Sequence, residues 1–307
     1  MQRYLLAFIL LCSSWGVQAQ SPAETFTQYL QAINTQGVVQ LPSRILENVA
    51  GNENALYEAA VPFLTDPSKQ TRTTAHWALH RIALNSPSEP FQQEMVNLFL
   101  QTKNGPTLYT VVSNWLSAYP PTSFDLAARS TLSRYIRADS SAYEPMIRLA
   151  GYLYLNEVGN TIVENLLEPN KLTEGERWTS WVVLARLGYP NAITYLQNNL
   201  SRVAVDDEII YGVYPDVVYT RQKELVSLIV ETVMSDDTQC SSANNDSDET
   251  ILCAYRAMEF LPGVIQDFPW QRDVTGDLDV DDYETALTQI RQWFVVHEDY
   301  QINRYDP

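Results

Sequence analysis

Glycine and basic residues are both scarce in this sequence. Its 307 residues include 11 glycines. There are 20 lysine and arginine residues, compared with 37 aspartate and glutamate residues. The shortage of glycine disfavours an all-β design that depends on glycine-rich turns. The shortage of basic residues leaves a net charge of −17, and a field of that sign repels phosphate backbones and anionic lipid. We therefore expect no nucleic-acid partner, and instead expect cations or basic partners.

The sequence also lacks the short motifs that mark common catalytic centres. It contains neither a Gly-x-Ser-x-Gly elbow nor a phosphate-binding glycine loop. Two acidic groups, Asp206-Asp207-Glu208 and Asp236-Asp237, offer paired carboxylates, which perform acid–base chemistry in glycosidases. Both groups border expected loops, where adjacent acids are usually solvated. The sequence therefore predicts a protein without catalysis. The alternative is a hydrolase that acts on sugar or peptide in an α-helical cleft.

Residues 1–19 have the features of a secretory signal peptide. Arg3 supplies the positive start, Tyr4–Leu11 is an unbroken apolar run, and Val17-Gln18-Ala19 is the small-x-small pattern before a cleavage site. The run is shorter than the ~20 apolar residues that span a bilayer. Leu11 before Cys12 disfavours a lipid anchor, which requires a small residue there. We expect cleavage after Ala19, export to the periplasm or the extracellular space, and no membrane span.

Export would leave two cysteines, Cys240 and Cys253. In an oxidising compartment an even pair of cysteines usually closes. The residues between them are polar and acidic without periodicity, which is typical of a surface loop. We predict a disulfide. The alternative is a metal site, although no third or fourth soft ligand lies nearby.

Apolar residues recur with a period near 3.6 in almost every periodic segment of the chain. One such stripe consists of Phe26, Tyr29, Leu30 and Ile33. Short segments rich in proline, serine, asparagine and glycine separate the stripes, as expected at helix ends. The pattern predicts an all-α fold of antiparallel helix pairs. Only Ile209–Tyr219 has a β-like composition, and no element is predicted there.

An arginine, a small residue and a leucine recur three times at the same spacing. The copies are Arg72-x-x-Ala75-x-x-x-Leu79, Arg148-x-x-Gly151-x-x-x-Leu155 and Arg177-x-x-Ser180-x-x-x-Leu184. The small residue lets two helices approach, and the leucine fills the layer four residues on. Gly159 and Gly188 follow the second and third copies, where each is expected to end a helix as a C-cap.

The stretch Val61-Pro62-Phe63-Leu64-Thr65-Asp66, followed by Arg72-x-x-Ala75, resembles a HEAT repeat. In that family a helix ending in Pro-x-Leu-x-Asp leads to a second helix that opens with Val-Arg-x-x-Ala. The run Leu184–Gly188 is similar to bacterial HEAT-like repeats. The resemblance implies a HEAT-like α-solenoid of helix hairpins, with Asp66 and Arg72 in a ladder between repeats. Thr71 replaces the family's valine, and Lys171 stands where the third copy should carry the aspartate. The alternative is an irregular helical bundle.

Residues 273–284 place oxygen atoms at the spacing of a calcium loop. Positions 1, 3, 5, 7, 9 and 12 are held by Asp273, Thr275, Asp277, Asp279, Asp281 and Glu284. The pattern resembles an EF-hand loop. Its opening also resembles a dockerin repeat, although dockerins carry two repeats and this chain shows one. Leu278 stands where an EF-hand has glycine, and Pro269 leaves little room for an entering helix. The alternative is an acidic, solvated turn that caps the last helix.

Two further groups of side chains are candidates for binding. His76 and His80 lie four residues apart on one helix face, a spacing that can seat zinc. No third ligand is evident, which favours a structural role. In the aromatic stretch, Tyr211, Tyr214 and Tyr219 are a candidate surface for stacking on a peptide or sugar. The alternative for these tyrosines is a packed loop between helices.

These patterns divide the chain into three expected parts. They are a signal peptide (1–19), a HEAT-like helical repeat domain (20–268), and a calcium loop with a capping C-terminal helix (269–307). The expected function is binding of a protein or peptide by the solenoid surface, with calcium as a stabilising ion. Carbohydrate is a second ligand class, and a calcium-stabilised structural component of the envelope is a further alternative.

Overall fold

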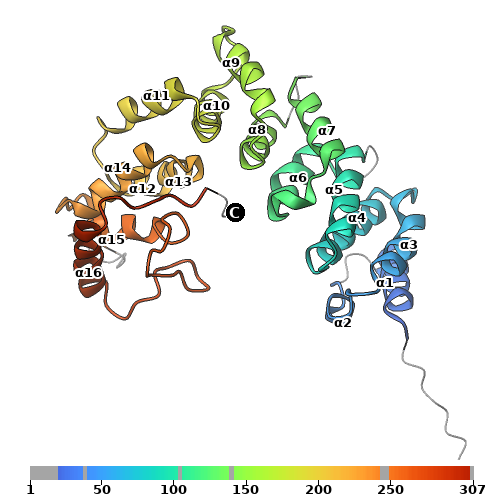
Figure 1. Cartoon of the computed structure of the whole chain (residues 1–307). Coiled ribbons are helices and arrows are strands. Elements are labelled where there is room, and N and C mark those ends of the chain that lie inside the picture. The colour runs from blue at the N-terminus through green and yellow to red at the C-terminus, as the bar shows by residue number, and fades with distance from the viewer. Residues whose placement is uncertain (1–19, 37–39, 103–105, 138–141, 243–248, 305–307) are drawn as a thin grey trace, which may run out of the picture. The chain divides into compact units, whose positions relative to one another are not determined.

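The computed structural model describes residues 20–36, 40–102, 106–137, 142–242 and 249–304. Helices dominate this part of the chain (Figure 1), so the predicted all-α fold is confirmed. Strand structure in the described residues is limited to two isolated bridges and one antiparallel pair, β1 (Cys240–Ser241) and β2 (Thr250–Ile251). The expected signal peptide at residues 1–19 lies outside the described residues.

Most helices follow one another through brief turns, and longer segments precede α15 and α16. The α-helices are α1 (Pro22–Gln36), α2 (Ser43–Leu46), α3 (Glu53–Leu64), α4 (Lys69–Leu84), α5 (Glu89–Gln101), α6 (Leu108–Asn114), α7 (Leu126–Arg137), α8 (Tyr143–Tyr152), α9 (Gly159–Leu167), α10 (Glu174–Arg186), α11 (Pro190–Leu200), α12 (Asp207–Gly212), α13 (Tyr214–Thr220), α14 (Lys223–Met234), α15 (Ala254–Ala257) and α16 (Tyr283–Val296). The 3-10 turns are η1 (Leu116–Ala118), η2 (Pro121–Ser123), η3 (Asn156–Val158) and η4 (Met258–Phe260). None of the helices in the described segments is both long enough and apolar enough to cross a membrane.

Local side chains fix where several helices begin. The Thr173 hydroxyl accepts a hydrogen bond from the backbone N–H of Glu176, whose carboxylate accepts one in return from the N–H of Thr173. This reciprocal capping box satisfies two N–H groups that the helix itself cannot bond. Ser68 caps α4 and Asp282 caps α16 through N–H groups three residues further on. The side chains of Thr173 and Glu176 therefore fix the start of α10.

Left-handed residues end two of the helices in the repeat copies. Gly188 has φ +83° and ends α10, and the N–H of Tyr189 donates to the carbonyl of Leu184 (3.0 Å). Tyr154, with φ +52°, holds the equivalent position after α8, where the N–H of Leu155 donates to the carbonyl of Ala150 (2.9 Å). The C-cap prediction is thus right for Gly188 and wrong for Gly159, which begins α9.

The chain divides into two compact units, and the boundary falls within α5. Unit 1 comprises residues 1–95 and 103–106. Here α1, α3 and α4 pack on one another, and the predicted stripes form their shared core. Its fully buried side chains include Phe26, Leu30, Leu56, Ala75, Leu79 and Ile82. Each buried leucine or isoleucine contributes about 1.5–3 kcal/mol.

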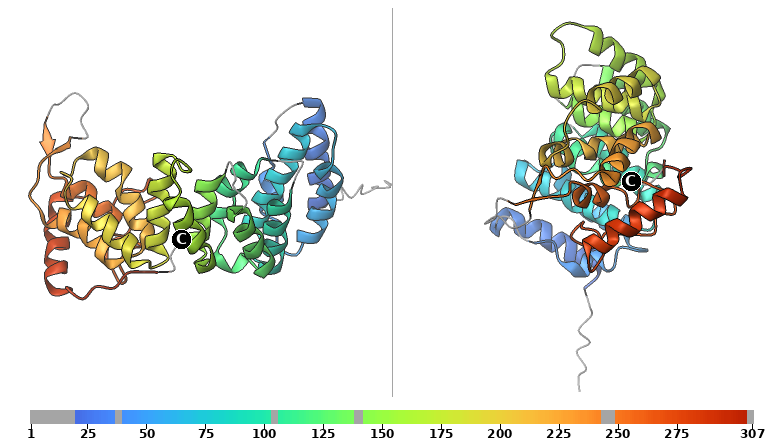
Figure 2. Two further views of the ribbon diagram at one scale, coloured as in Figure 1. Left: turned by 90° about the horizontal axis from the view of Figure 1, so that it is seen from above. Right: turned by 90° about the vertical axis from the view of Figure 1, so that its left-hand side faces the viewer.

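Unit 2 comprises residues 96–102 and 107–307, so the expected segment 269–307 belongs with the helices before it. Its central helices pack on one another. Helix α10 lies between α8 and α13, while α11 packs on α10 and on α14. Figure 2 shows the strand pair at the end of a loop that projects from the orange and red helices of this unit.

Gly151 shows why the repeat copies need a small residue. An ideal Cβ atom at Gly151 would lie 2.3 Å from the hydroxyl oxygen of Tyr219 and 3.2 Å from a methyl carbon of Val183. Those side chains come from α13 and α10. The predicted close approach at this position is therefore confirmed, and a larger side chain would push α8 away from its neighbours.

Candidate functional site

Most of the predicted calcium donors lie in a tight hairpin. The N–H of Asp273 donates to the carbonyl of Asp277 (2.9 Å), and Gly276 closes the turn with φ +96°. One carboxylate oxygen of Asp273 accepts bonds from the Thr275 hydroxyl (2.7 Å) and from the N–H groups of Thr275, Gly276 and Asp277. These bonds, led by that of the hydroxyl, lower the pKa of Asp273. The ionised carboxylate therefore holds the turn together.

The residues after this turn lead into α16. Leu278 is only 3% exposed and anchors the hairpin in the core. Asp282 caps α16, and Glu284 lies in the first turn of that helix, so the expected helix after the loop is present. Across the described residues, no three His, Cys, Asp or Glu side chains gather closely enough to hold a metal ion. The hydrogen bonds fit the alternative of an acidic turn before the last helix, and the calcium loop stays a prediction.

The two histidines of unit 1 are core residues. His76 and His80 lie on α4 and are 2% and 5% exposed. The Nδ1 atom of His76 lies 2.7 Å from the carbonyl oxygen of Arg72. Burial lowers the pKa of both imidazoles, that of His80 to about 4. These surroundings fit the structural role that the sequence favoured.

The buried His80 predicts a loss of stability in acid. Its folded pKa lies below the unfolded value of about 6.5, so the unfolded chain binds a proton that the folded chain excludes. We expect the free energy of unfolding to fall by about 2 kcal/mol between pH 7 and pH 4.5 through this residue. Urea denaturation of the wild type and of His80→Gln at both pH values measures the loss. The variant should show a smaller fall, and the exposed control His297→Gln should match the wild type. Equal falls in all three proteins would contradict the assignment.

The aromatic stretch that had no assignment forms two short helices, α12 and α13. Tyr211 is 52% exposed, whereas Tyr214 is 4% exposed and its hydroxyl lies 2.6 Å from that of Thr232. The hydroxyl of Tyr219 donates to the carbonyl of Arg148 (2.5 Å), and burial raises the pKa of this tyrosine. The expectation that all three tyrosines present one stacking surface is therefore wrong for Tyr214 and Tyr219, which are needed for helix packing.

Three members of the acidic groups also have structural partners. The Asp206 carboxylate caps α12 by accepting from the N–H of Ile209 (3.0 Å), and that of Asp207 accepts from the N–H of Ser241 (2.8 Å). Asp236 pairs with Arg291 (2.9 Å). Glu259, which the sequence did not single out, is half-buried and accepts from the Tyr283 hydroxyl (2.9 Å). Burial raises the pKa of Glu259.

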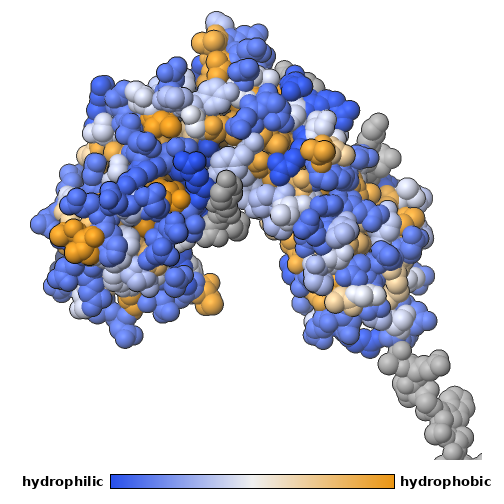
Figure 3. All heavy atoms as spheres, in the orientation of Figure 1, coloured by the Kyte–Doolittle hydropathy of each residue, from blue (hydrophilic) through white to orange (hydrophobic). Residues whose placement is uncertain are grey.

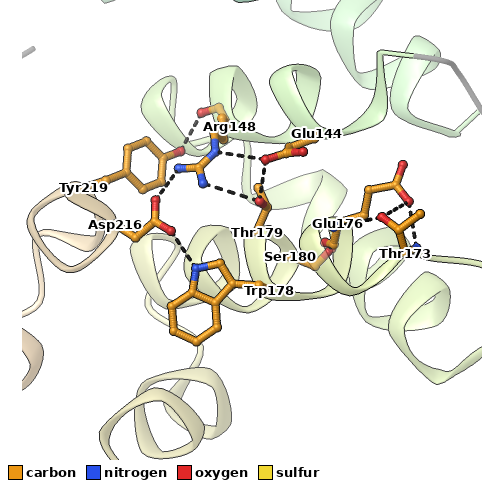
Figure 4. Close-up of polar contacts among 9 residues, drawn as sticks. All are labelled: Glu144, Arg148, Thr173, Glu176, Trp178, Thr179, Ser180, Asp216 and Tyr219. Atoms are coloured by element: carbon orange, nitrogen blue, oxygen red, sulfur yellow. Dashed lines mark hydrogen bonds and ion pairs between the residues drawn. The ribbon is translucent and has the colours of Figure 1, made fainter. Parts of the chain in front are cut away.

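An ion pair and a hydrogen bond to the same carboxylate join α8, α10 and α13 of unit 2 (Figure 4). Arg148 on α8 pairs with Asp216 on α13 (2.8 Å), and the indole N–H of Trp178 on α10 donates to the same carboxylate (2.6 Å). Thr179, also on α10, donates to the carboxylate of Glu144 on α8 (2.9 Å). The repeat pattern singled out Arg148 but not Asp216, because no local motif surrounds that aspartate.

A buried cation lies next to this ion pair. Arg186 is 4% exposed, and its guanidinium carbon lies 4.6 Å from the ring centre of Tyr219 and 5.2 Å from that of Tyr154. It donates to the carbonyl oxygens of Gly151 (3.1 Å) and Tyr219. The tyrosine rings thus enclose a cation of the chain itself, which is a helix-packing device and no ligand cage.

Unit 2 contains a mostly apolar pocket with a volume of about 200 Å³. Its apolar lining comes from α11, the following turn, α12, α13 and α14, and consists of Leu200, Val203, Val205, Ile209, Tyr214, Val217 and Leu228. Its polar lining consists of Ser201, Glu231, Thr232, Ser235 and Asp237. At about 30 Å³ per water molecule, the volume equals that of six or seven waters, which is the size of one large side chain. Apolar walls with a few polar groups are the usual composition of binding sites.

The disulfide lies next to two segments that line this pocket. Cys240 and Cys253 are bonded (2.04 Å), as predicted from the cysteine count. Both are fully buried, although the sequence between them was expected to form a surface loop. The N–H of Cys253 donates to the carbonyl of Asp237 (2.9 Å), and its sulfur lies 3.5 Å from the carbonyl oxygen of Val205. Val205 and Asp237 both line the pocket. The bridge therefore positions walls that are more than 30 residues apart in the chain.

A larger hollow of about 550 Å³ lies beside the end of α16. Its lining includes Trp293. The ring of His297 stacks on that of Trp293, with a distance of 4.3 Å between ring centres and an angle of 12° between ring planes. The rings of Trp293 and Phe268 also form a T-shaped pair, with their centres 5.3 Å apart. Because a neighbouring ring already covers one face of the indole, this hollow is a weaker candidate for stacking a sugar.

A scan against protein-family models finds no match, and searches of curated proteins and of solved structures find none either. The HEAT-like resemblance therefore remains an interpretation of the residues. The surface seen in Figure 3 is mainly hydrophilic, with separate hydrophobic patches, one of them over α9. Leu167 at the end of α9 is 77% exposed.

Proposed function

We propose that this chain is an exported, non-catalytic binding protein that holds a protein or peptide partner in unit 2. The observation that carries the proposal is the pocket between α11 and α14, with apolar walls and the acidic side chains of Glu231 and Asp237 at its rim. Its volume suits one side chain of a partner, and a few such anchors carry most of the energy of many interfaces.

The packing of unit 2 supports the HEAT-like interpretation. Helices α8, α10 and α13 lie side by side, and α11 packs on both α10 and α14. Stacked helix hairpins of this kind present extended surfaces to partners. The proposal is therefore that the pocket is one part of a longer binding surface on stacked hairpins.

The polar contacts support binding over hydrolysis. Three of the acids that the hydrolase alternative would use, Asp206, Asp207 and Asp236, serve as a helix cap, as a backbone acceptor and as an ion-pair partner. The buried Arg186 and the Arg148–Asp216 pair join helices to one another. The bonded cysteines agree with an oxidising compartment, which supports the proposed export to the periplasm or the extracellular space.

Photo-crosslinking at the pocket rim tests the proposed function. A photoreactive amino acid at Val203, which is 45% exposed and lines the pocket, reports what lies against it. The matched control position is Leu126 on α7, which is 85% exposed. In the native exported fraction, we expect a discrete protein adduct at Val203 and none at Leu126. Equal labelling at both positions, or no protein adduct at Val203, would remove the proposal.

Calcium remains the proposed stabilising ion of the hairpin at residues 273–284. The spacing of its oxygen donors supports this. At a calcium concentration 100 times the dissociation constant, binding would add about 2.7 kcal/mol, or about 5–10 °C in Tm for a unit of this size. Melting curves in calcium and in chelator measure the shift. We expect Asp277→Asn with Glu284→Gln to abolish it and the exposed control Asp299→Asn to leave it unchanged. Identical curves for the wild type in calcium and in chelator would end the calcium proposal.

A further inference from the structure

The negative charge of the chain is concentrated in its last third. Residues 201–307 contain 22 acidic and 7 basic residues, a net charge of −15, whereas residues 1–200 contain 15 and 13, a net charge of −2. The pocket between α11 and α14 lies in the strongly acidic part of the chain. Positively charged partners are therefore drawn to this region and not evenly to the whole molecule.

Several basic residues of this region are engaged with the chain itself. Arg221 is 8% exposed and donates to the carbonyl of Gly263 (2.8 Å). Arg272 donates to the carbonyl of Glu259 (2.8 Å). Arg291 donates to the carbonyl oxygens of Val233 and Ser235 and pairs with Asp236. The net charge of −15 already counts these guanidinium groups, so the acidic surplus of this region remains.

Two acidic residues of this region line the pocket. Glu231 on α14 and Asp237 in the turn after it are both exposed and line its rim. Within the described residues, neither carboxylate has a hydrogen-bond or ion-pair partner. Next to them the walls are aliphatic, formed by Val203, Val205 and Leu228. The pocket thus presents an apolar recess and negative charge side by side.

We propose that the occupant of this pocket is a basic polypeptide segment. An apolar side chain of the segment enters the recess, while lysine or arginine residues next to it face Glu231 and Asp237. This inference rests on the proposed function and specifies the partner. A small free cation would gain nothing from the aliphatic walls, and a second copy of this chain would bring its own charge of −17 against the same field.

Anisotropy titration with a defined peptide tests the inference. The probe is a fluorescein-labelled decapeptide of alternating lysine and leucine, compared with lysine–serine and glutamate–leucine peptides of the same length. We expect binding of the lysine–leucine peptide, at least 10-fold weaker binding of the other two, and a steep loss of affinity with added salt. Equal binding of the lysine–serine peptide would overturn the inference, because the recess would then have no part in it.

Protein variants localise the effect. The double variant Glu231→Gln with Asp237→Asn should weaken lysine–leucine binding about 5- to 10-fold and reduce its salt dependence. The control Glu298→Gln with Asp299→Asn removes the same charge at two other exposed positions and should change the affinity less than twofold. If both double variants lost the same affinity for the peptide, the attraction would come from the overall negative charge. That result would overturn the proposal that the peptide binds at this pocket.

A filled pocket gives a second readout. Ile209→Trp, checked for folding by its melting curve, should weaken the same peptide about 10-fold by occupying the recess. If the lysine–leucine peptide fails to bind while a protein is still crosslinked at Val203, the proposed function survives and this inference falls. If neither is observed, both fall.

Discussion

Replacing Arg186 with methionine should lower the free energy of unfolding of the protein by about 3–5 kcal/mol. Methionine retains most of the apolar volume but no donor, so the carbonyl oxygens of Gly151 and Tyr219 lose the bonds that Arg186 makes to them. Each hydrogen bond to a charged group is worth about 1.5–3 kcal/mol. The tyrosine rings around the guanidinium would also lose an attraction of up to about 2 kcal/mol.

Urea denaturation followed by circular dichroism measures this loss. Arg186→Lys keeps the charge without the planar group and should lose less than methionine does. Arg134→Met on α7 is the control, because Arg134 is exposed and its bond is to the Thr131 hydroxyl. We expect a change within about 0.5 kcal/mol there. A loss below about 1 kcal/mol for Arg186→Met would show that the buried cation does not hold α8, α10 and α13 together.

Removing the disulfide should cost about 3 kcal/mol. In the chain-entropy model, a bridge that closes a loop of this length, with its cysteines 13 residues apart, restricts the unfolded chain by that amount. The double variant Cys240→Ser with Cys253→Ser should therefore unfold at lower denaturant concentration than the oxidised wild type. Reductant should shift the wild type to the same midpoint and leave the double variant unchanged.

Loss of the disulfide should also weaken binding at the pocket. Cys253 touches the backbone of both Val205 and Asp237, so an open bridge frees two of its walls. We expect weaker crosslinking at Val203 in the double variant under conditions where it remains folded. A double variant as stable as the oxidised wild type would contradict the role of the bridge.

The sequence was informative where local rules decide the structure. The stripe of Phe26, Leu30 and Ile33 is buried because its period of 3.6 places these side chains on one face of α1. Thr173 and Glu176 cap α10 because their spacing closes a reciprocal pair of bonds. Two cysteines in an expected oxidising compartment predicted a bond that the structure contains.

Tertiary contacts decided the rest. The stretch Ile209–Tyr219 is rich in β-branched residues, yet Asp206 caps α12, Pro215 stands in the first turn of α13, and Tyr214 is buried. Burial in this case outweighs the weak helix preference of valine and isoleucine. Tyr154 takes a left-handed position where glycine is usual, beside the buried Arg186. No pattern around residue 154 indicates this.

The pocket could not be predicted from the sequence, because tertiary contacts also form it. Leu200, Ile209 and Leu228 each belong to an ordinary amphipathic segment, and only the packing of α11, α12 and α14 brings them to one recess. The rim acids Glu231 and Asp237 stand among many others in an acidic chain. The net charge of the chain favours a basic partner, whereas the proposed place of binding required the fold.

Hydrogen–deuterium exchange tests the central claim most directly, because it shows which backbone segments a bound partner covers. The measurement compares the protein alone with the protein in excess lysine–leucine peptide or in complex with the partner crosslinked at Val203. We predict slower exchange in residues 200–217 and 228–237 and no change in α1, α3 and α4. Protection confined to other segments, or no protection at all under saturating conditions, would contradict a binding function for this pocket.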